Sequence, residues 1–190
     1  MALAKPHVTT ASDFRQLLRK SDNSGSLLEL IHGEVIEKVP TEAHGKLAAL
    51  IAHFLLAFIL PRGIKAHVGV EVRHEAPGDQ YNSRLPDVSL RLSDAPPVDS
   101  GAVAQMPDLA VEIQSPADRP HQMREKALYY LQKNTRLVWL VYIADQRVEV
   151  CTLDDGGNLN IVTATMDDTL DGGAVLPEFT LPVRALFPDA

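Results

Sequence analysis

Two carboxylates, Asp87 and Glu112, lie in segments where burial would be costly unless they bind something. Glu112 falls inside the apolar stretch Leu109–Ile113, and the period of two along a strand puts it on the same face as Gln114. A carboxylate in a core strand must be paired, hydrogen-bonded or bound to a metal ion. The simpler alternative is that this strand has a half-exposed face.

Asp87 follows Pro86 and opens a second alternating segment, 85–92, whose polar face also carries Ser89. If the two strands are neighbours in one sheet, Asp87 and Glu112 converge on one side. Two converging carboxylates suit a hard divalent cation such as Mg or Mn. Such an ion can polarise a phosphoryl oxygen and generate hydroxide from bound water, which is the chemistry that phosphodiester hydrolysis requires.

Hydrophobic periodicity and turn residues predict the elements that position these side chains. We expect helices over 11–20, 45–60 and 118–133, strands over 64–75, 85–92, 108–114 and 137–143, hairpins over 27–39 and 147–165, and a loop-rich tail. The helix over 45–60 is apolar on nearly all sides, which predicts that other elements cover it. The order strand, helix, strand over 108–143 predicts a parallel crossover.

Composition limits the class of protein. A chain of 190 residues with 45% hydrophobic content predicts one globular domain spanning 1–190. The single cysteine, Cys151, excludes an internal disulfide, and the stretch Met1–Thr10 has no signal-peptide pattern, so we expect a cytoplasmic protein. The apolar run Leu47–Leu60 falls short of the ~20 residues that span a bilayer, and we interpret it as a buried helix without a membrane partner.

Charge and missing motifs narrow the function further. A net charge of −7 gives no global attraction to nucleic acid, so any contact with DNA must be local. The sequence contains no Walker loop and no Gly-x-Gly-x-x-Gly motif, and His74-Glu75 lacks the second histidine of a zinc-protease helix. Nucleotide-driven enzymes and zinc peptidases are therefore excluded.

Several segments together carry a wider resemblance. They are Leu28–Glu34, Glu42–Gly45, Arg84–Val88, Pro107–Pro116, Glu125–Lys126 with Tyr130, Val138–Val141 and Leu176–Phe179. This set resembles the Uma-two family of restriction-endonuclease-like proteins (domain of unknown function eight-twenty), within the PD-(D/E)XK nuclease superfamily. The resemblance covers almost the whole chain. It implies an α/β (α+β) fold with a central mixed β-sheet flanked by helices, a core at about 41–145, and added N-terminal and C-terminal hairpins.

The resemblance also implies roles for individual residues. Asp87 and Glu112 match the metal-binding aspartate and glutamate of the superfamily. Two positions after Glu112, Gln114 stands where the superfamily has lysine, and Lys126 on the next helix is the expected substitute. Tyr130 lies one turn later on the same helix face. The alternative for Lys126 is a solvated helix lysine.

Two further candidates come from the flanking motifs. His44 lies near the start of the apolar helix, where it could hold a water molecule or a phosphate near the metal. Glu34 falls in the early strand motif and is either an additional acidic site residue or a surface carboxylate. A nuclease should also have a local basic groove, for which the candidates are Arg84, Arg119, Arg124 and Lys126.

Three functions are compatible with these features. The first is a Mg-dependent DNA endonuclease in which Gln114 or Lys126 positions the attacking water and Lys126 offsets transition-state charge. The second is a catalytically inactive binding or regulatory module, suggested by the missing in-strand lysine and the acidic net charge. The third, a carboxylate-dyad hydrolase acting on sugars, is disfavoured by the family resemblance.

Nucleases of this fold often act as dimers, so a homodimer is a further expectation.

Overall fold

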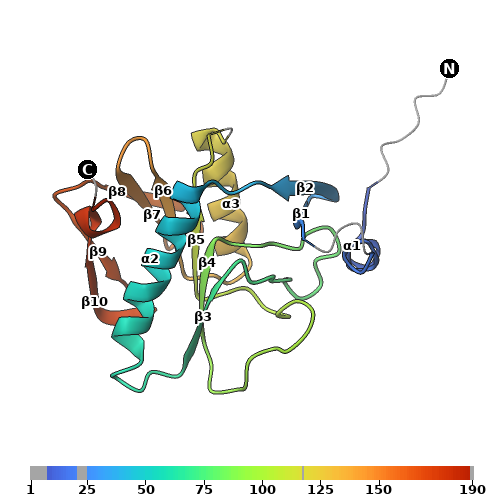
Figure 1. Cartoon of the computed structure of the whole chain (residues 1–190), viewed down its shortest axis with the longest axis horizontal. Helices are drawn as coiled ribbons and strands as arrows, with labels where there is room; N and C mark the ends of the chain where they lie inside the picture. Colours follow the sequence, from blue (N-terminus) through green and yellow to red (C-terminus); the bar gives the residue numbers. More distant parts are fainter. Residues whose placement is uncertain (1–7, 21–24, 117, 189–190) are drawn as a thin grey trace.

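The computed structural model describes residues 8–20, 25–116 and 118–188. The helices are α1 (Ala11–Leu18), α2 (Glu42–Ile59) and α3 (Pro120–Gln132), followed near the end by the 3₁₀ helix η2 (Val183–Leu186). The strands are β1 (Leu27–Ile31), β2 (Glu34–Lys38), β3 (Ala66–Val70), β4 (Val88–Leu92), β5 (Leu109–Ile113), β6 (Leu137–Tyr142), β7 (Arg147–Leu153), β8 (Leu159–Ala164), β9 (Thr169–Gly172) and β10 (Leu176–Pro182). Figure 1 shows α2 in front of the central strands, with β1, β2 and α1 at one end and β9 and β10 at the other.

Six strands form the central sheet in the order β3-β4-β5-β6-β7-β8. The pair β5 and β6 is parallel and every other neighbouring pair is antiparallel. The helix α3 connects β5 to β6, which confirms the predicted crossover and the mixed α/β fold class. The hairpin predicted over 147–165 is confirmed as β7 and β8, and it continues the central sheet.

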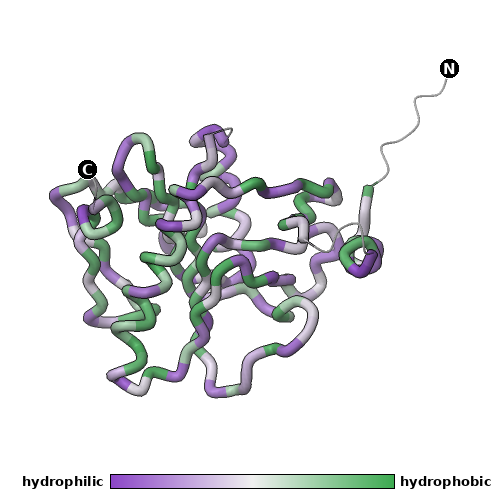
Figure 2. Tube along the Cα trace, in the orientation of Figure 1, coloured by the Kyte–Doolittle hydropathy of each residue, from purple (hydrophilic) through white to green (hydrophobic). Residues whose placement is uncertain are grey.

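The two faces of the sheet carry separate apolar cores. Along β5, Leu109, Val111 and Ile113 pack in a core with α2, Trp139 and the C-terminal hairpin. Ala110 faces the other way and packs with α3. Figure 2 shows hydrophobic residues concentrated along α2 and the central strands. Because residues alternate between faces along a strand, Glu112 is directed to the side of the sheet that α3 covers.

The prediction that other elements cover α2 on nearly all sides is wrong. Its residues Lys46, His53 and Leu56 lie on an exposed side, although the opposite side is buried against the sheet. The helix is 18 residues long and by length and composition alone is apolar enough to cross a membrane. The core helix of a globular domain meets the same criterion, and the packing of α2 on the sheet is of that kind.

Two strand predictions also need correction. The strand expected over 64–75 ends at Val70, because Glu71 adopts a left-handed backbone with φ of 52°, which an extended strand cannot accommodate. The tail expected to be rich in loops contains the antiparallel hairpin β9–β10. Its proline Pro177 lies where the register shifts between Leu176 and Thr180, and such irregularities tolerate proline in a strand.

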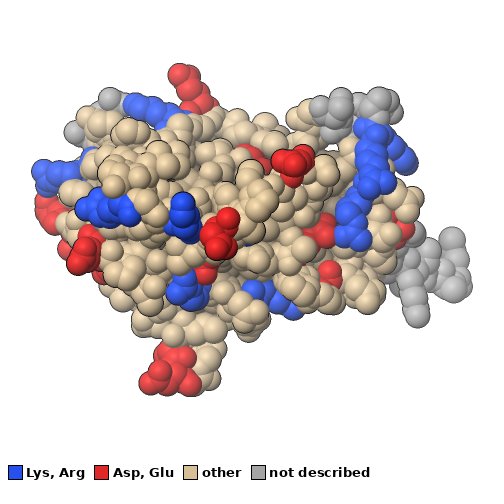
Figure 3. All heavy atoms as spheres, turned by 90° about the horizontal axis from the view of Figure 1, so that it is seen from below, with Lys and Arg blue, Asp and Glu red and all other residues tan. Residues whose placement is uncertain are grey.

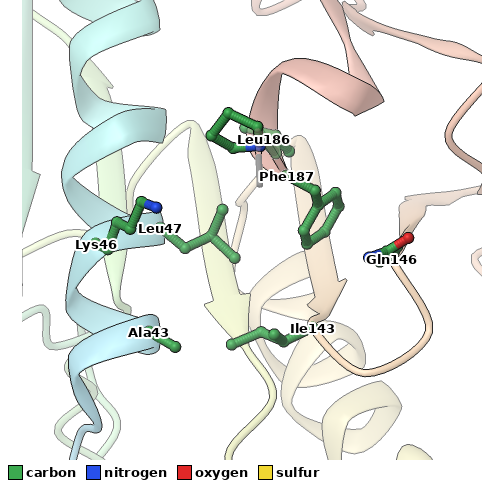
Figure 4. Close-up of a pocket in the computed structure, with 8 residues that line it drawn as sticks. Ala43, Lys46, Leu47, Ile143, Gln146, Leu186 and Phe187 are labelled. Atoms are coloured by element: carbon green, nitrogen blue, oxygen red, sulfur yellow. The ribbon is translucent and has the colours of Figure 1, made fainter. Parts of the chain in front are cut away.

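A small pocket of about 230 Å³ lies between the first turns of α2, the end of β6 and η2. Figure 4 shows Ala43 and Leu47 of α2 across from Ile143 and Phe187. Its lining is mainly apolar. This pocket therefore offers no obvious chemistry, and the polar site lies elsewhere.

Candidate metal centre

A cleft of about 690 Å³ lies between the hairpin β1–β2, the start of α2, the adjacent ends of β4 and β5, and α3. Both Asp87 and Glu112 line it. So do His44, Glu34, Lys126 and, of the proposed basic groove, Arg84. The structure thus gathers into one cleft side chains that lie between 34 and 126 in the sequence.

Asp87 and Glu112 are neighbours because β4 and β5 are antiparallel. Val88 pairs with Val111, so continuing the register by one residue places Asp87 beside Glu112. The amide N–H of Ile113 donates a hydrogen bond of 2.6 Å to Asp87 Oδ2. Both residues are only 1% exposed, and the convergence expected from the alternating patterns is confirmed.

Glu112 is held by α3. Lys126 Nζ donates to Glu112 Oε2 at 3.0 Å, and the Tyr130 hydroxyl donates to Oε1 at 2.7 Å. Lys126 and Tyr130 are four residues apart, which places them on one side of the helix. Burial raises the pKa of Glu112, while the charge of Lys126 opposes that rise. Burial lowers the pKa of Lys126, but the surrounding carboxylates, Glu112 foremost, together raise it overall.

Asp87 is held by the start of α2. His44 Nε2 lies 3.0 Å from Asp87 Oδ2, and Thr41 positions this turn by accepting the His44 amide N–H. Burial raises the pKa of Asp87, but hydrogen bonds and charge from His44 and Lys38 outweigh it and bring the pKa to about 2. Burial lowers the pKa of His44, but the hydrogen bond and charge of Asp87, with the charge of Glu71, together outweigh it, so the net shift is upward.

Two members of the cluster, Lys38 and Glu71, were not predicted from the sequence. Lys38 Nζ at the end of β2 donates to Asp87 Oδ1, to Glu71 Oε2 at 3.0 Å and to the Leu85 carbonyl at 2.7 Å. Burial lowers the pKa of Lys38, but the surrounding carboxylates raise it overall. Burial and the nearby charge of Asp87 raise the pKa of Glu71 to about 7, despite the opposing charge of Lys38.

The donor set fits a hard divalent cation. One ligand atom each from His44, Glu71 and Asp87 lies within 4.8 Å of the others. Carboxylate oxygens suit Mg and Mn, and imidazole suits Mn and later metals. Glu112 borders the same group through Asp87, although its own oxygens are directed to Lys126 and Tyr130.

Other predicted residues lie differently. Among the described residues that line the cleft, Gln114 is absent, and its Nε2 donates to the Asp118 carbonyl at 3.0 Å. Glu34 is exposed at the rim. Neither position tests a role in catalysis, so both roles stay predictions.

The proposed basic groove is smaller than expected. Arg124 pairs with Glu149 of β7 at 2.7 Å, and neither Arg124 nor Arg119 is among the described residues that line the cleft. On the face drawn in Figure 3, basic side chains are mixed with acidic ones. Of the four candidates only Arg84 and Lys126 reach the cleft, so any attraction for nucleic acid has to be concentrated there.

Glu149 provides a test of the electrostatics away from the cleft. Burial raises its pKa, but hydrogen bonds from Arg124, Arg147 and Tyr142 outweigh this and lower the pKa from 4.5 to about 2. A lowered carboxylate pKa contributes stability above its unfolded value, which is lost as pH falls toward the folded value. We therefore expect the free energy of unfolding, measured in urea, to fall more steeply between pH 4.5 and 2 for the wild type than for Glu149→Gln. Parallel curves in that window would contradict this assignment.

Comparisons with known proteins show the family and the fold of the chain. A family model, Uma2, described as "Putative restriction endonuclease", matches residues 11–184. The chain belongs to the Uma2 family. A crystal structure titled as a "putative nuclease belonging to DUF820" from Anabaena variabilis ATCC 29413 is similar, with a TM-score of 0.75 and 22% identity over 94% of this chain and 97% of that chain. At this identity, the similarity shows that the Uma2 protein and the Anabaena variabilis protein share a fold. No curated protein matches it.

Proposed function

We propose that this protein is a divalent-metal-dependent endonuclease that hydrolyses DNA phosphodiester bonds. The observation that carries the proposal is the buried pair Asp87 and Glu112, side by side at the ends of two antiparallel strands in an open cleft. Asp87 and Glu112 would hold Mg or Mn, with His44 and Glu71 within reach of the same ion. Bound there, the ion would supply Lewis-acid chemistry and a hydroxide nucleophile.

The protein's own groups would position the reaction. The ammonium of Lys126 holds the Glu112 carboxylate and places a positive charge beside the reacting phosphate, where it offsets developing negative charge. Tyr130 fixes the second oxygen of Glu112, so the carboxylate is oriented before substrate arrives.

The buried thiol of Cys151 is free, which is compatible with the cytoplasm that we propose as the location.

Arg84 supplies a candidate contact for the substrate phosphate. It is 2% exposed, lines the cleft, and stacks over the Tyr129 ring with 4.2 Å between guanidinium carbon and ring centroid. Its Nε and Nη1 are buried without a hydrogen-bond partner among the described residues. Buried donors are nearly always satisfied in folded proteins, and phosphate is a preferred partner of guanidinium groups. We therefore propose that Arg84 binds the DNA backbone once its guanidinium turns toward the cleft that it lines.

A second candidate function is a binding module without catalysis. One observation favours it: Lys38 already pairs with both Asp87 and Glu71, so these carboxylates have a cationic partner without a metal ion. The cleft would then recognise a partner through its charged groups. The two functions differ in whether the protein binds metal and cleaves DNA.

The deciding experiment titrates Mg and Mn by calorimetry into the wild type, Asp87→Asn and Glu112→Gln, and then measures plasmid nicking at the same metal concentrations. Metal binding that needs both carboxylates, with nicking reduced at least ~100-fold in each variant, would support the nuclease. Lys133→Met is the matched control, because its partner Asp79 lies outside the cleft lining. No binding and no nicking by a folded wild type would favour the binding module.

A further inference from the structure

The ammonium of Lys38 occupies a pocket made of oxygen atoms. Its three donors are directed to the carboxylates of Asp87 and Glu71 and to the carbonyl of Leu85. The Lys38 side chain is 12% exposed and those of Asp87 and Glu71 are 1% and 17% exposed. A lysine has three donors and no acceptor, so this arrangement uses its full hydrogen-bonding capacity.

The same two carboxylates belong to the group that fits a divalent cation. Asp87 and Glu71, with His44, place ligand atoms within 4.8 Å of one another. A metal ion bound to these oxygens at 2.0–2.6 Å would lie next to the ammonium of Lys38. Two positive charges at such a separation in a partly buried site repel strongly. The ammonium of Lys38 and a metal ion would therefore compete for these oxygens.

The position of Lys38 would allow its side chain to leave the carboxylates. It is the last residue of β2, and the next residue, Val39, is 77% exposed. Its four-carbon side chain is flexible, and the adjoining cleft has a volume of about 690 Å³. Turning the side chain into the cleft would release Asp87 and Glu71 without a change in the sheet, because the hairpin β1–β2 is a separate two-stranded sheet.

We infer that Lys38 is a built-in competitor of the divalent metal and sets the metal affinity of the site. This inference rests on the proposed metal-dependent function. Metal binding would exchange one cation for another, so the measured affinity is the intrinsic affinity of the carboxylates and imidazole reduced by the cost of displacing Lys38. Methionine at this position keeps the length and apolar stem of the side chain but removes the charge.

The test is calorimetric titration of Mn into the wild type, Lys38→Met and Lys38→Gln, with circular dichroism to confirm folding. We expect the folded variants to bind Mn about 10- to 100-fold more tightly than the wild type, because a competing unit charge has been removed. Lys133→Met removes the same charge from a pair outside the cleft lining and should leave the affinity unchanged. Lys38→Gln keeps a donor for the Leu85 carbonyl and serves if Lys38→Met does not fold.

The possible outcomes separate the inference about Lys38 from the proposed metal-dependent function. Tighter binding in the Lys38 variants supports the inference, including the case in which only the variants bind measurably. Equal or weaker binding in the folded variants, with a wild type that does bind, overturns the inference and leaves the nuclease proposal standing. If neither the wild type nor the variants bind Mn, both the inference and the metal-dependent function fail.

Discussion

Lys126→Met is expected to lower the free energy of unfolding by about 3–5 kcal/mol, the cost of leaving a buried carboxylate without its counter-charge. Glu112 is 1% exposed and receives its only described lysine contact from Lys126, at 3.0 Å. Tyr130 alone then remains to satisfy it. The measurement is urea unfolding followed by circular dichroism at neutral pH.

A second substitution shows whether the loss comes from the stranded charge. In Lys126→Met/Glu112→Gln the carboxylate is gone, while the amide oxygen can still accept the Tyr130 hydroxyl. We expect the double variant to recover most of the lost stability, since replacing both members of a buried pair costs far less than removing one. Lys133→Met, which breaks a partly exposed pair with Asp79 at 3.4 Å, should cost less than about 1 kcal/mol. A double variant no more stable than Lys126→Met would contradict this account.

Arg84→Met is expected to weaken binding of DNA by about 10- to 100-fold, the range for losing hydrogen bonds from a charged donor. Its stability should be unchanged or higher, because the substitution removes a buried guanidinium with two unpartnered nitrogens. Affinity is measured by fluorescence anisotropy with a hydrolysis-resistant phosphorothioate oligonucleotide in Mg. The opposite signs of the two effects separate a ligand-binding residue from a structural one.

Arg73→Met is the matched control for Arg84. Arg73 is partly buried, but unlike Arg84 it has a partner for its guanidinium. Its Nη2 donates to the Leu28 carbonyl at 2.7 Å, and the group lies over the Phe14 ring. Removing it should destabilise the fold near β1 and leave the affinity for the oligonucleotide unchanged. If Arg84→Met destabilises the protein and binds DNA as the wild type does, the phosphate assignment is wrong.

Periodicity predicted most of the fold because the central strands have long, clear patterns. The alternation along Leu109–Ile113 and 85–92 placed Asp87 and Glu112 on one side, and the structure agrees. It failed where a local backbone change overrides the pattern. At Glu71 the left-handed backbone ends β3, and near Pro177 a register shift accompanies a strand in the tail that we expected to be rich in loops.

The site was predicted less completely than the sheet. His44, Lys126 and Tyr130 do gather around the two carboxylates, as the family resemblance implied. Lys38 and Glu71 were missed because each is a charged residue at or directly after the end of a short strand, and periodicity cannot say whether such a side chain meets solvent or a neighbouring element. Only the three-dimensional packing of the hairpin β1–β2 against the start of β4 brings them together.

The hairpin β1–β2 forms a two-stranded sheet of its own and joins the rest of the molecule through hydrogen bonds and a small apolar cluster. Leu30 bridges to Ser83 through two backbone hydrogen bonds, and Glu29 accepts the Leu85 amide N–H. Its apolar contacts form a small cluster separate from both cores of the sheet. Such units open locally at a lower free energy than global unfolding. Each opening would withdraw Lys38 from the carboxylates and uncover the backbone beside Arg84. Amide hydrogen exchange in the hairpin should therefore report how often the cleft loses the positive charge of Lys38.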